Sequence, residues 1–293
     1  VKPIYSDIQY VGLHDKLIRV EDVGKFGLID YKGNTIVYPQ YLYMSDFYNS
    51  KALVKDKDSN YYFINEKGNV IGELDISDKN IQIEDSYNEG FVKISCNNKY
   101  GLMSDAGDIV LEPIYDNIEE FYNGFARIKL DSKWGVINRE GEISVENKYY
   151  NIGCFFDNVA MVSNFYDYKQ KYGCIDSSGE LFIPIKYDEI DFIHYHDMVI
   201  IKLEGKYGVI DMKNNIVLDA IYDKIDYFGG DRLWVTLGNK LGLFDIEGNQ
   251  LTELKYEKMM NNGNIEMIPV MINNKWGFLD LDGDKKIDTK YDE

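Results

Sequence analysis

Short runs of apolar, strand-forming residues alternate along this chain with short polar turns. Trp134 to Asn138 is one such run, Arg139, Glu140 and Gly141 turn the chain, and Glu142 to Val145 returns as a second run. Apolar runs of this length, separated by a glycine-containing turn, are typical of a β-hairpin. The segments between hairpins show no apolar spacing of helical period, so the pattern predicts strands throughout.

The hairpin pattern recurs along the chain. Copies begin at an aromatic-glycine step, as in Lys99-Tyr100-Gly101 and Lys133-Trp134-Gly135, and the copy at Asn60-Tyr61-Tyr62 lacks the glycine. The copies begin near residues 25, 60, 99, 133, 171, 206, 240 and 275, which places successive starts 34 to 39 residues apart. A period in this range indicates a repeat array whose units bury their faces against their neighbours.

The hairpin turn has nearly constant chemistry. An Asp, Asn or Ser begins it, and a glycine follows three residues later in every copy except one, where Asn214 stands instead. The turn residues are Asp30, Asn65, Ser104, Asn138, Asp176, Asp211, Asp245 and Asp280. This spacing predicts a type I turn followed by a residue with positive φ, a conformation that glycine and asparagine tolerate best.

A tyrosine follows eight residues after the turn glycine in seven of the copies, often with an acid behind it, as in Tyr115-Asp116. A weaker segment and then a firm strand, such as Phe125 to Leu130, complete the unit, which therefore reads as an antiparallel meander of four strands. Both faces of these strands are apolar. We expect the units to stack, with the small glycine leaving room for a neighbour's aromatic ring.

The expected fold is all-β: about eight antiparallel β-meander units of about 35 residues in one domain, residues 1–293. The chain opens with a partial unit, residues 1–24, and ends with a hairpin that lacks its last segments. The first strong strand, Lys16 to Val20, could complete the last sheet. We therefore favour an eight-bladed, β-propeller-like ring over an open β-hairpin solenoid, which would need polar caps.

The charge balance restricts the partners. Fifty acidic residues oppose 32 basic ones, for a net charge of −18. This field repels phosphate backbones and anionic lipid surfaces, so we expect neither nucleic acid nor membrane as a partner. No apolar run reaches the length of a membrane span and no signal-peptide pattern is visible, so a cytoplasmic location is favoured over export.

Three groups of residues are candidates for metal or thiol sites. Asp280, Asp282, Asp284 and Asp288 imitate a calcium loop, but Lys285 occupies the glycine position of that loop, and the segment aligns with the ordinary hairpin turn, which we favour. His194 and His196 lack a third ligand and read as a surface loop. Cys96, Cys154 and Cys174 form no metal-binding or disulfide pattern and are expected to be buried, reduced thiols. No cofactor is expected.

The Lys-Trp-Gly and Lys-Tyr-Gly steps, the turn glycine and the later Pro-x-Tyr-Asp resemble the WG (also called KWG) repeat family of bacterial proteins, over roughly residues 3–293. The resemblance implies a β-rich repeat scaffold, often fused to other domains, with no catalytic motif to transfer.

No catalytic set is visible, so the function favoured by the sequence is a non-catalytic module that binds a protein partner through its acidic surface and its non-repeating loops, Leu74–Ser86 and Asp191–Asp197. The first alternative is a glycan- or cell-wall-binding module that uses exposed aromatic residues. The second is a glycosidase-like enzyme with carboxylates in a central channel.

Overall fold

The computed structural model describes residues 5–11, 16–74, 81–193, 196–260 and 267–292, and every regular element in them is a β-strand. The prediction of an all-β repeat of antiparallel meanders is therefore confirmed. Within these ranges no helix is long and apolar enough to cross a bilayer. The chain divides into two compact units, Val1–Phe156 and Asp157–Glu293, which are described separately.

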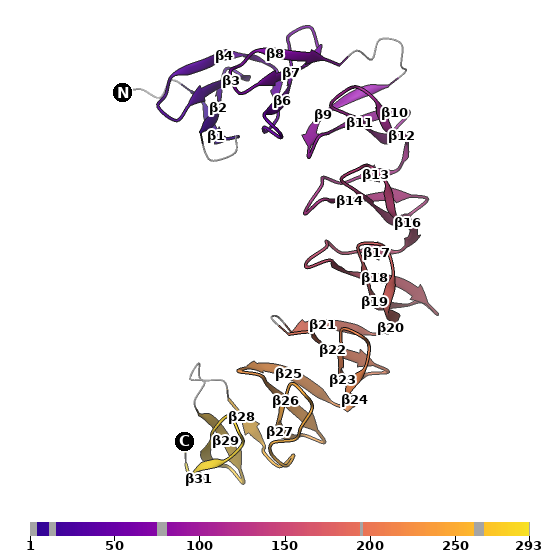
Figure 1. Cartoon of the computed structure of the whole chain (residues 1–293). Coiled ribbons are helices and arrows are strands. Elements are labelled where there is room, and N and C mark those ends of the chain that lie inside the picture. Colours follow the sequence, from indigo (N-terminus) through magenta and orange to yellow (C-terminus); the bar gives the residue numbers. More distant parts are fainter. Residues whose placement is uncertain (1–4, 12–15, 75–80, 194–195, 261–266, 293) are drawn as a thin grey trace. The chain divides into compact units, whose positions relative to one another are not determined.

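Unit 1 contains four antiparallel sheets, each built from four consecutive strands (Figure 1). The first contains β1 (Asp7–Tyr10), β2 (Leu17–Asp22), β3 (Lys25–Asp30) and β4 (Thr35–Tyr41). The second contains β5 (Tyr43–Met44), β6 (Lys51–Lys55), β7 (Tyr61–Asn65) and β8 (Val70–Glu73). The third contains β9 (Gln82–Asn88), β10 (Phe91–Cys96), β11 (Lys99–Ser104) and β12 (Ile109–Tyr115). The fourth contains β13 (Asn117–Ile118), β14 (Phe125–Leu130), β15 (Lys133–Asn138) and β16 (Ile143–Tyr149), after which β17 (Asn151–Ile152) follows.

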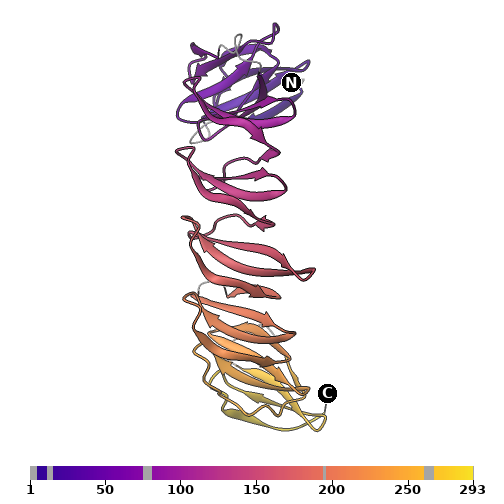
Figure 2. The same cartoon turned by 90° about the vertical axis from the view of Figure 1, so that its right-hand side faces the viewer.

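Unit 2 repeats the arrangement, and Figure 2 shows its strands from a second side. Its first strands are β18 (Val159–Tyr166), β19 (Lys169–Asp176) and β20 (Leu181–Tyr187). The next sheet contains β21 (Glu189–Ile193), β22 (Met198–Leu203), β23 (Lys206–Asp211) and β24 (Ile216–Tyr222). A three-stranded sheet holds β25 (Lys224–Gly229), β26 (Arg232–Leu237) and β27 (Lys240–Asp245). The last contains β28 (Lys258–Met259), β29 (Ile268–Ile272), β30 (Lys275–Leu279) and β31 (Lys285–Tyr291).

The sheets do not begin where the sequence repeat begins. The strand before each aromatic-glycine step pairs with the strand that carries the step, as Leu17–Asp22 (β2) pairs with β3, because only a two-residue turn separates them. β2 also pairs with β1. The proposal that Lys16 to Val20 completes the last sheet is therefore wrong, since both edges of β2 are occupied within its own sheet. Closure of the repeat into an eight-bladed ring stays a prediction.

The hairpin turns have the predicted chemistry. In the first of them Asp30 Oδ1 accepts hydrogen bonds from the N–H groups of Lys32 (2.9 Å) and Asn34 (2.8 Å), and the N–H of Gly33 donates to the Asp30 carbonyl. Gly33 has φ of 85°, and Asn214 has φ of 61° in the copy that lacks the glycine. In seven of the eight turns the side chain of the first residue accepts two backbone N–H groups, and in the turn of Asp245 it accepts that of Asn249. The turns are therefore closed locally and fix the register of their hairpins.

The glycine of the aromatic-glycine step has another role than the one expected. A Cβ on Gly135 would lie 2.5 Å from the carbonyl oxygen of Val145 on the neighbouring strand, and one on Gly208 would lie 2.7 Å from that of Leu218. The register shifts at this point, where Trp134 pairs with Tyr149 but Val136 pairs with Val145. The bulge brings the neighbouring backbone close, so the glycine makes room for main chain and not for a ring from another unit.

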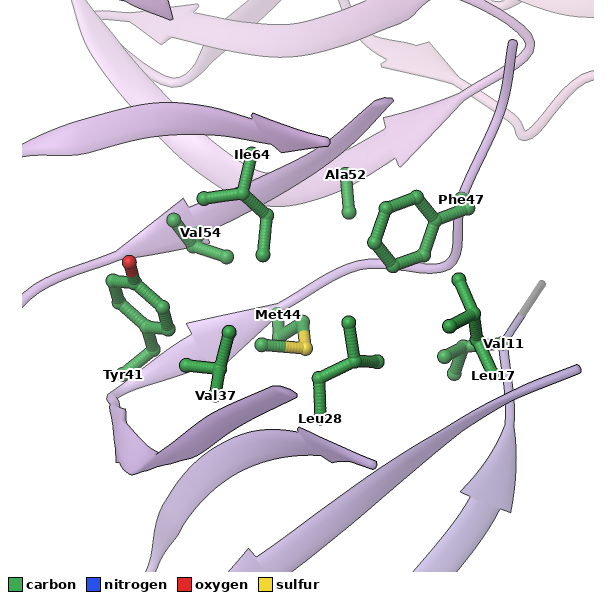
Figure 3. Packing of buried hydrophobic residues seen from close by; sticks show 10 residues of the cluster. All are labelled: Val11, Leu17, Leu28, Val37, Tyr41, Met44, Phe47, Ala52, Val54 and Ile64. Carbon is green, nitrogen blue, oxygen red and sulfur yellow. The ribbon is translucent and has the colours of Figure 1, made fainter. Parts of the chain in front are cut away.

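The core lies between consecutive sheets within each unit. In unit 1, Leu28 and Val37 of the first sheet pack with Met44, Ala52 and Val54 of the second, and their side chains point toward one another (Figure 3). Equivalent clusters join the third and fourth sheets and, in unit 2, the sheets of β21–β24 and β25–β27. The predicted stacking of meanders therefore holds within each unit and covers the apolar faces of the strands.

The lysine of the step and the acid behind the later tyrosine form a recurring ion pair. Lys171 Nζ lies 2.5 Å from Asp188 Oδ1, while Asp188 Oδ2 accepts the N–H of Gly205 (3.3 Å). The pairs Lys99–Asp116, Lys206–Asp223, Lys240–Glu257 and Lys275–Asp292 repeat it. The acid therefore joins one hairpin to the turn of the next.

These contacts give stability a defined pH dependence. The hydrogen bond from Lys171 holds the pKa of Asp188 below its ordinary value, so its contribution is present above the unfolded-state pKa near 3.9 and is lost as pH falls through the lower folded-state pKa. We expect Asp188→Asn to destabilise the protein by about 1 kcal/mol at pH 7, with the difference from wild type shrinking below about pH 4. Urea unfolding across this range measures it. Asp219→Asn, at an exposed position of β24, is the control, and a difference for Asp188→Asn that grows with acidity would contradict the assignment.

Candidate functional site

A groove of about 400 Å³ opens in unit 1 beside the strands β9, β10 and β11 and the segment that follows β13. Its volume lies within the range of ligand-binding pockets. The groove combines an apolar floor with an acidic rim. The floor is formed by Phe91, Tyr100, Leu102, Ile118 and Phe121, and the rim by Glu84, Asp85, Glu119 and Glu120, with Ser86, Asn88 and Lys93 completing the lining.

The floor is held by a stacked pair of aromatic rings. Phe91 and Phe121 lie with their centroids 5.0 Å apart and their planes at 15°. The N–H of Phe121 donates to Asn88 Oδ1 at 2.7 Å, which ties the segment after β13 to the end of β9. Both phenylalanines are buried. The groove is therefore preformed, because its walls belong to strands and to a segment with its own hydrogen bond.

Lys93 lines the groove, and its ammonium group is held by a hydrogen bond and an aromatic ring. Its Nζ donates to the carbonyl oxygen of Ile118 at 2.7 Å and lies 4.3 Å from the centroid of the Tyr100 ring. Burial lowers the pKa of Lys93, although Glu84, Glu120 and Glu119 act in the opposite direction.

The equivalent position in two other sheets of unit 1 also holds a cation. Arg19 donates to the carbonyl of Met44 and Arg127 to that of Ile152, each at 2.6 Å. All three cations connect one sheet to the first short strand of the next. Lys93 therefore has a structural role, because its hydrogen bond connects two neighbouring sheets of the repeat. This role argues against a catalytic function for its amine.

The carboxylates on the rim are held in different ways. Ser95 Oγ donates to Glu84 at 2.5 Å, and Tyr61 Oη donates to Asp85 at 2.7 Å. Arg127 Nε donates to Glu119 at 2.6 Å, whereas Glu120 is exposed. Asp85 also pairs with Lys55 (3.3 Å) and Glu119 with Arg127 (2.5 Å), so cations of the scaffold neutralise these two carboxylates. Glu84 and Glu120 form no ion pair with another described residue, and their negative charge attracts a cation.

Unit 2 has a smaller groove of about 190 Å³ in the corresponding place. Two of its three acids are paired with lysines that line the same groove: Lys202 lies 2.7 Å from Glu189, and Lys224 lies 2.7 Å from Asp226. The third acid is Asp191. The groove of unit 1 is larger and has two carboxylates, Glu84 and Glu120, that form no ion pair with another described residue, so it is the stronger candidate for binding a cation.

The aspartates considered for calcium serve the hairpin turn. Asp280 Oδ1 accepts the N–H groups of Asp282 (3.1 Å) and Asp284 (2.8 Å), and Asp280 Oδ2 lies 2.6 Å from Lys286 Nζ. Asp288 pairs with Lys285 at 2.5 Å. Within the described ranges no three acidic, histidine or cysteine side chains are grouped so that they could hold a metal. The favoured interpretation of this segment as a turn agrees with these contacts.

The histidines and cysteines considered as metal or thiol sites do not form a common site among the described residues. His194 lies outside the described residues, and His196 Nε2 lies 3.1 Å from Tyr227 Oη and 3.2 Å from Asp231. Of the cysteines, Cys174 is buried, which raises its pKa to about 12, while Cys96 is half-buried. Cys154 is exposed, so the expectation of three buried thiols is wrong for it, because it lies outside the strands in the segment after β17.

The groove itself was not predicted from the sequence. The sequence does indicate the irregular segment Leu74–Ser86 as a binding loop. Residues 75–80 of it lie outside the described part, but Glu84, Asp85 and Ser86 belong to β9 and line the groove. The two acidic pairs, Glu84-Asp85 and Glu119-Glu120, were the available signal. No feature of the sequence around either pair indicated that both pairs line the same groove.

Comparison with known proteins identifies the repeat. A family model described as WG containing repeat matches residues 26–61, 100–134, 134–164, 172–207, 207–240 and 242–276. No curated protein sequence matches significantly.

Several solved structures have been matched to the chain. A eukaryotic initiation factor is 11% identical, with 100% of this chain and 90% of that one covered and a TM-score of 0.37. Hsv2p of Kluyveromyces lactis is 10% identical, with 82% and 92% covered and a TM-score of 0.37. PorZ of Porphyromonas gingivalis, a bacterial surface component of the type-IX secretion system, is 10% identical, with 96% and 50% covered and a TM-score of 0.32.

These TM-scores lie below 0.5, so we infer nothing about this chain from those structures. The sequence repeat carries the assignment. Its six matches together span more than half of the residues and include five of the aromatic-glycine steps, from Phe26-Gly27 to Tyr207-Gly208. The chain belongs to the family of proteins that contain WG repeats.

Proposed function

We propose that this protein is a non-catalytic binding module that takes up a cationic segment of a partner protein in the groove of unit 1. The observation that carries the proposal is the combination, in one preformed groove, of an apolar floor with an acidic rim on which Glu84 and Glu120 form no ion pair with another described residue. A lysine or arginine side chain matches both features, because its aliphatic stem can lie on Phe91 and Phe121 while its charged head reaches Glu84 or Glu120.

The charge of the whole chain supports this choice of partner. A net charge of −18 attracts a basic protein segment and speeds its encounter with the groove, and it repels nucleic acid and anionic lipid. The carboxylates of the rim support a role in binding over one in catalysis: Glu84, Asp85 and Glu119 each accept a hydrogen bond from a residue of the scaffold.

A labelled oligolysine peptide provides the direct test, by fluorescence anisotropy at low salt. We expect the double variant Glu84→Gln, Glu120→Gln to weaken binding about tenfold, because it removes two charges from the rim. The control is Glu112→Gln, Asp219→Asn, which makes the same change of charge at exposed positions outside the groove and should alter the Kd less than twofold.

Two results would contradict the groove as the site. Equal weakening by both double variants would mean that the peptide responds only to the overall field of the protein. Equal binding of a peptide with acetylated lysines would mean that the cationic head is not recognised.

A further inference from the structure

A second pocket of unit 1, which we name the small pocket, adjoins the groove. It has a volume of about 30 Å³, and Glu119 and Glu120 line both the groove and the small pocket. The other lining residues come from β14, from β15 and from the segments before β14 and after β17: Tyr122, Phe125, Arg127, Val136, Gly153, Cys154 and Phe155. The groove and the small pocket therefore share one wall, the dipeptide Glu119-Glu120.

The groove and the small pocket are lined by equivalent positions of consecutive repeats. In each, the lining includes the first and third residues of one strand, the fourth residue of the next strand and the three residues after the following short strand. These residues are Phe91, Lys93, Leu102 and Glu119 to Phe121 in the groove, and Phe125, Arg127, Val136 and Gly153 to Phe155 in the small pocket. Stacked sheets lie about 10 Å apart, so the two sites follow each other along the repeat at about this distance.

The floor of the small pocket is apolar and is held by contacts of its own. The rings of Phe125 and Phe155 lie with their centroids 4.7 Å apart. Asn123 Nδ2 donates to the carbonyl oxygen of Phe155 at 3.2 Å, which ties the segment before β14 to the segment after β17. Phe155 and Val136 are buried. The small pocket is therefore preformed, as the groove is.

The two sites differ in charge and in size. At the positions where the groove has Glu119 and Glu120, the small pocket has the uncharged residues Gly153 and Cys154. The guanidinium of Arg127, which also lines the small pocket, lies 2.5 Å from Glu119 and is neutralised by it. The groove therefore favours a cation, whereas the small pocket favours an apolar side chain. A volume of about 30 Å³ suits a side chain of the size of alanine or valine.

We propose that the small pocket is a second subsite for the partner segment, which lies extended across both sites with a lysine or arginine in the groove and a short apolar side chain three residues away in the small pocket. A chain in the polyproline II conformation has three residues per turn and advances about 3.1 Å per residue. Side chains three residues apart then point to the same side at a distance of about 9 Å, which matches the distance between the sites. The inference rests on the proposed function, because it takes the occupant of the groove to be a basic protein segment.

The test compares two labelled peptides by fluorescence anisotropy at low salt. Lys-Val-Pro-Pro-Lys-Pro-Pro-Val-Lys places each valine three residues from the central lysine, and Lys-Pro-Val-Pro-Lys-Pro-Val-Pro-Lys places each valine two residues from it. The peptides have the same composition and the same lysine positions, and their prolines favour the polyproline II conformation. We expect the first peptide to bind at least threefold more tightly, because only its spacing lets a valine enter the small pocket and leave water.

Cys154→Glu tests the small pocket itself. Cys154 is exposed and lines the small pocket, so the variant adds a carboxylate there without changing the core. We expect the preference for the first peptide to disappear in this variant, because a valine side chain would have to take water away from the carboxylate. Cys154→Ser, which is similar in size and uncharged, is the matched control and should keep the preference.

Equal affinity of the wild-type protein for both peptides would overturn the inference, and so would a preference that Cys154→Glu retains. Either result leaves the proposed function intact as long as Glu84→Gln, Glu120→Gln still weakens the binding of oligolysine. If that double variant binds oligolysine as tightly as the wild type, the proposed function itself is wrong, and the inference is wrong with it.

Discussion

Replacing Gly135 with alanine is expected to destabilise the protein by about 3 kcal/mol. The added methyl group would lie 2.5 Å from the carbonyl oxygen of Val145 and 2.9 Å from the backbone nitrogen of Asn147. Both are main-chain atoms of the neighbouring strand, so no rotamer change can relieve the clash. The strand must move and disturb the pairs Trp134↔Tyr149 and Val136↔Val145. Urea unfolding followed by tryptophan fluorescence measures the loss.

Gly72→Ala is the matched control. Gly72 also lies in a strand of unit 1, β8, but a Cβ there would meet nothing within 4 Å. We expect its effect on the free energy of unfolding to stay within about 0.5 kcal/mol, or to be slightly stabilising, because alanine restricts the unfolded chain. If both variants lose the same stability, the close approach of backbone at the aromatic-glycine step is not the reason for that glycine.

The two kinds of glycine in the repeat show which features can be predicted from sequence. The turn glycine, such as Gly141, could be assigned because its need for positive φ is local and its Asx partner stands three residues before it. The step glycine could be located but not explained. Its reason is a bulge ten residues further along, where the Val145 carbonyl approaches, and the depth of that bulge depends on sheet geometry.

The same division applies to the sheets and the groove. The four strands of each meander were predicted, but the sheet boundary was misplaced because the recurring motif was taken as the start of the unit. Two-residue turns such as Asn97-Asn98 were a usable signal that β10 pairs with β11. The groove could not be predicted, since Glu84 stands on β9 and Glu120 in the segment after β13, and the two come to line one groove only through packing.

The second large effect is expected from Arg127→Ala, at about 2 kcal/mol of destabilisation. Arg127 Nη1 donates to the carbonyl of Ile152 at 2.6 Å, Nε donates to Glu119 at 2.6 Å, and the guanidinium lies over the Trp134 ring. Alanine would leave the Glu119 carboxylate and the Ile152 carbonyl without this donor. Charge-assisted bonds of this kind contribute more than neutral ones, and leaving a partly buried acceptor unsatisfied adds its desolvation cost.

Lys129→Ala distinguishes the effect of the two Arg127 hydrogen bonds from that of a cation–π contact with Trp134. Lys129 Nζ also lies over Trp134, 5.3 Å from the ring centroid, on the same strand as Arg127. A partly exposed cation–π contact contributes about 0.5–1 kcal/mol, so Lys129→Ala should cost no more than that. Arg127→Met tests the contribution of packing: methionine keeps an apolar side chain beside Trp134 but forms neither hydrogen bond. Methionine also occurs at the equivalent position of the next hairpin, where Met161 pairs with Cys174 as Arg127 pairs with Val136. If the Met variant is as stable as wild type, packing alone joins the sheets here; if it loses most of what the Ala variant loses, the cation holds β14 to the carbonyl of Ile152.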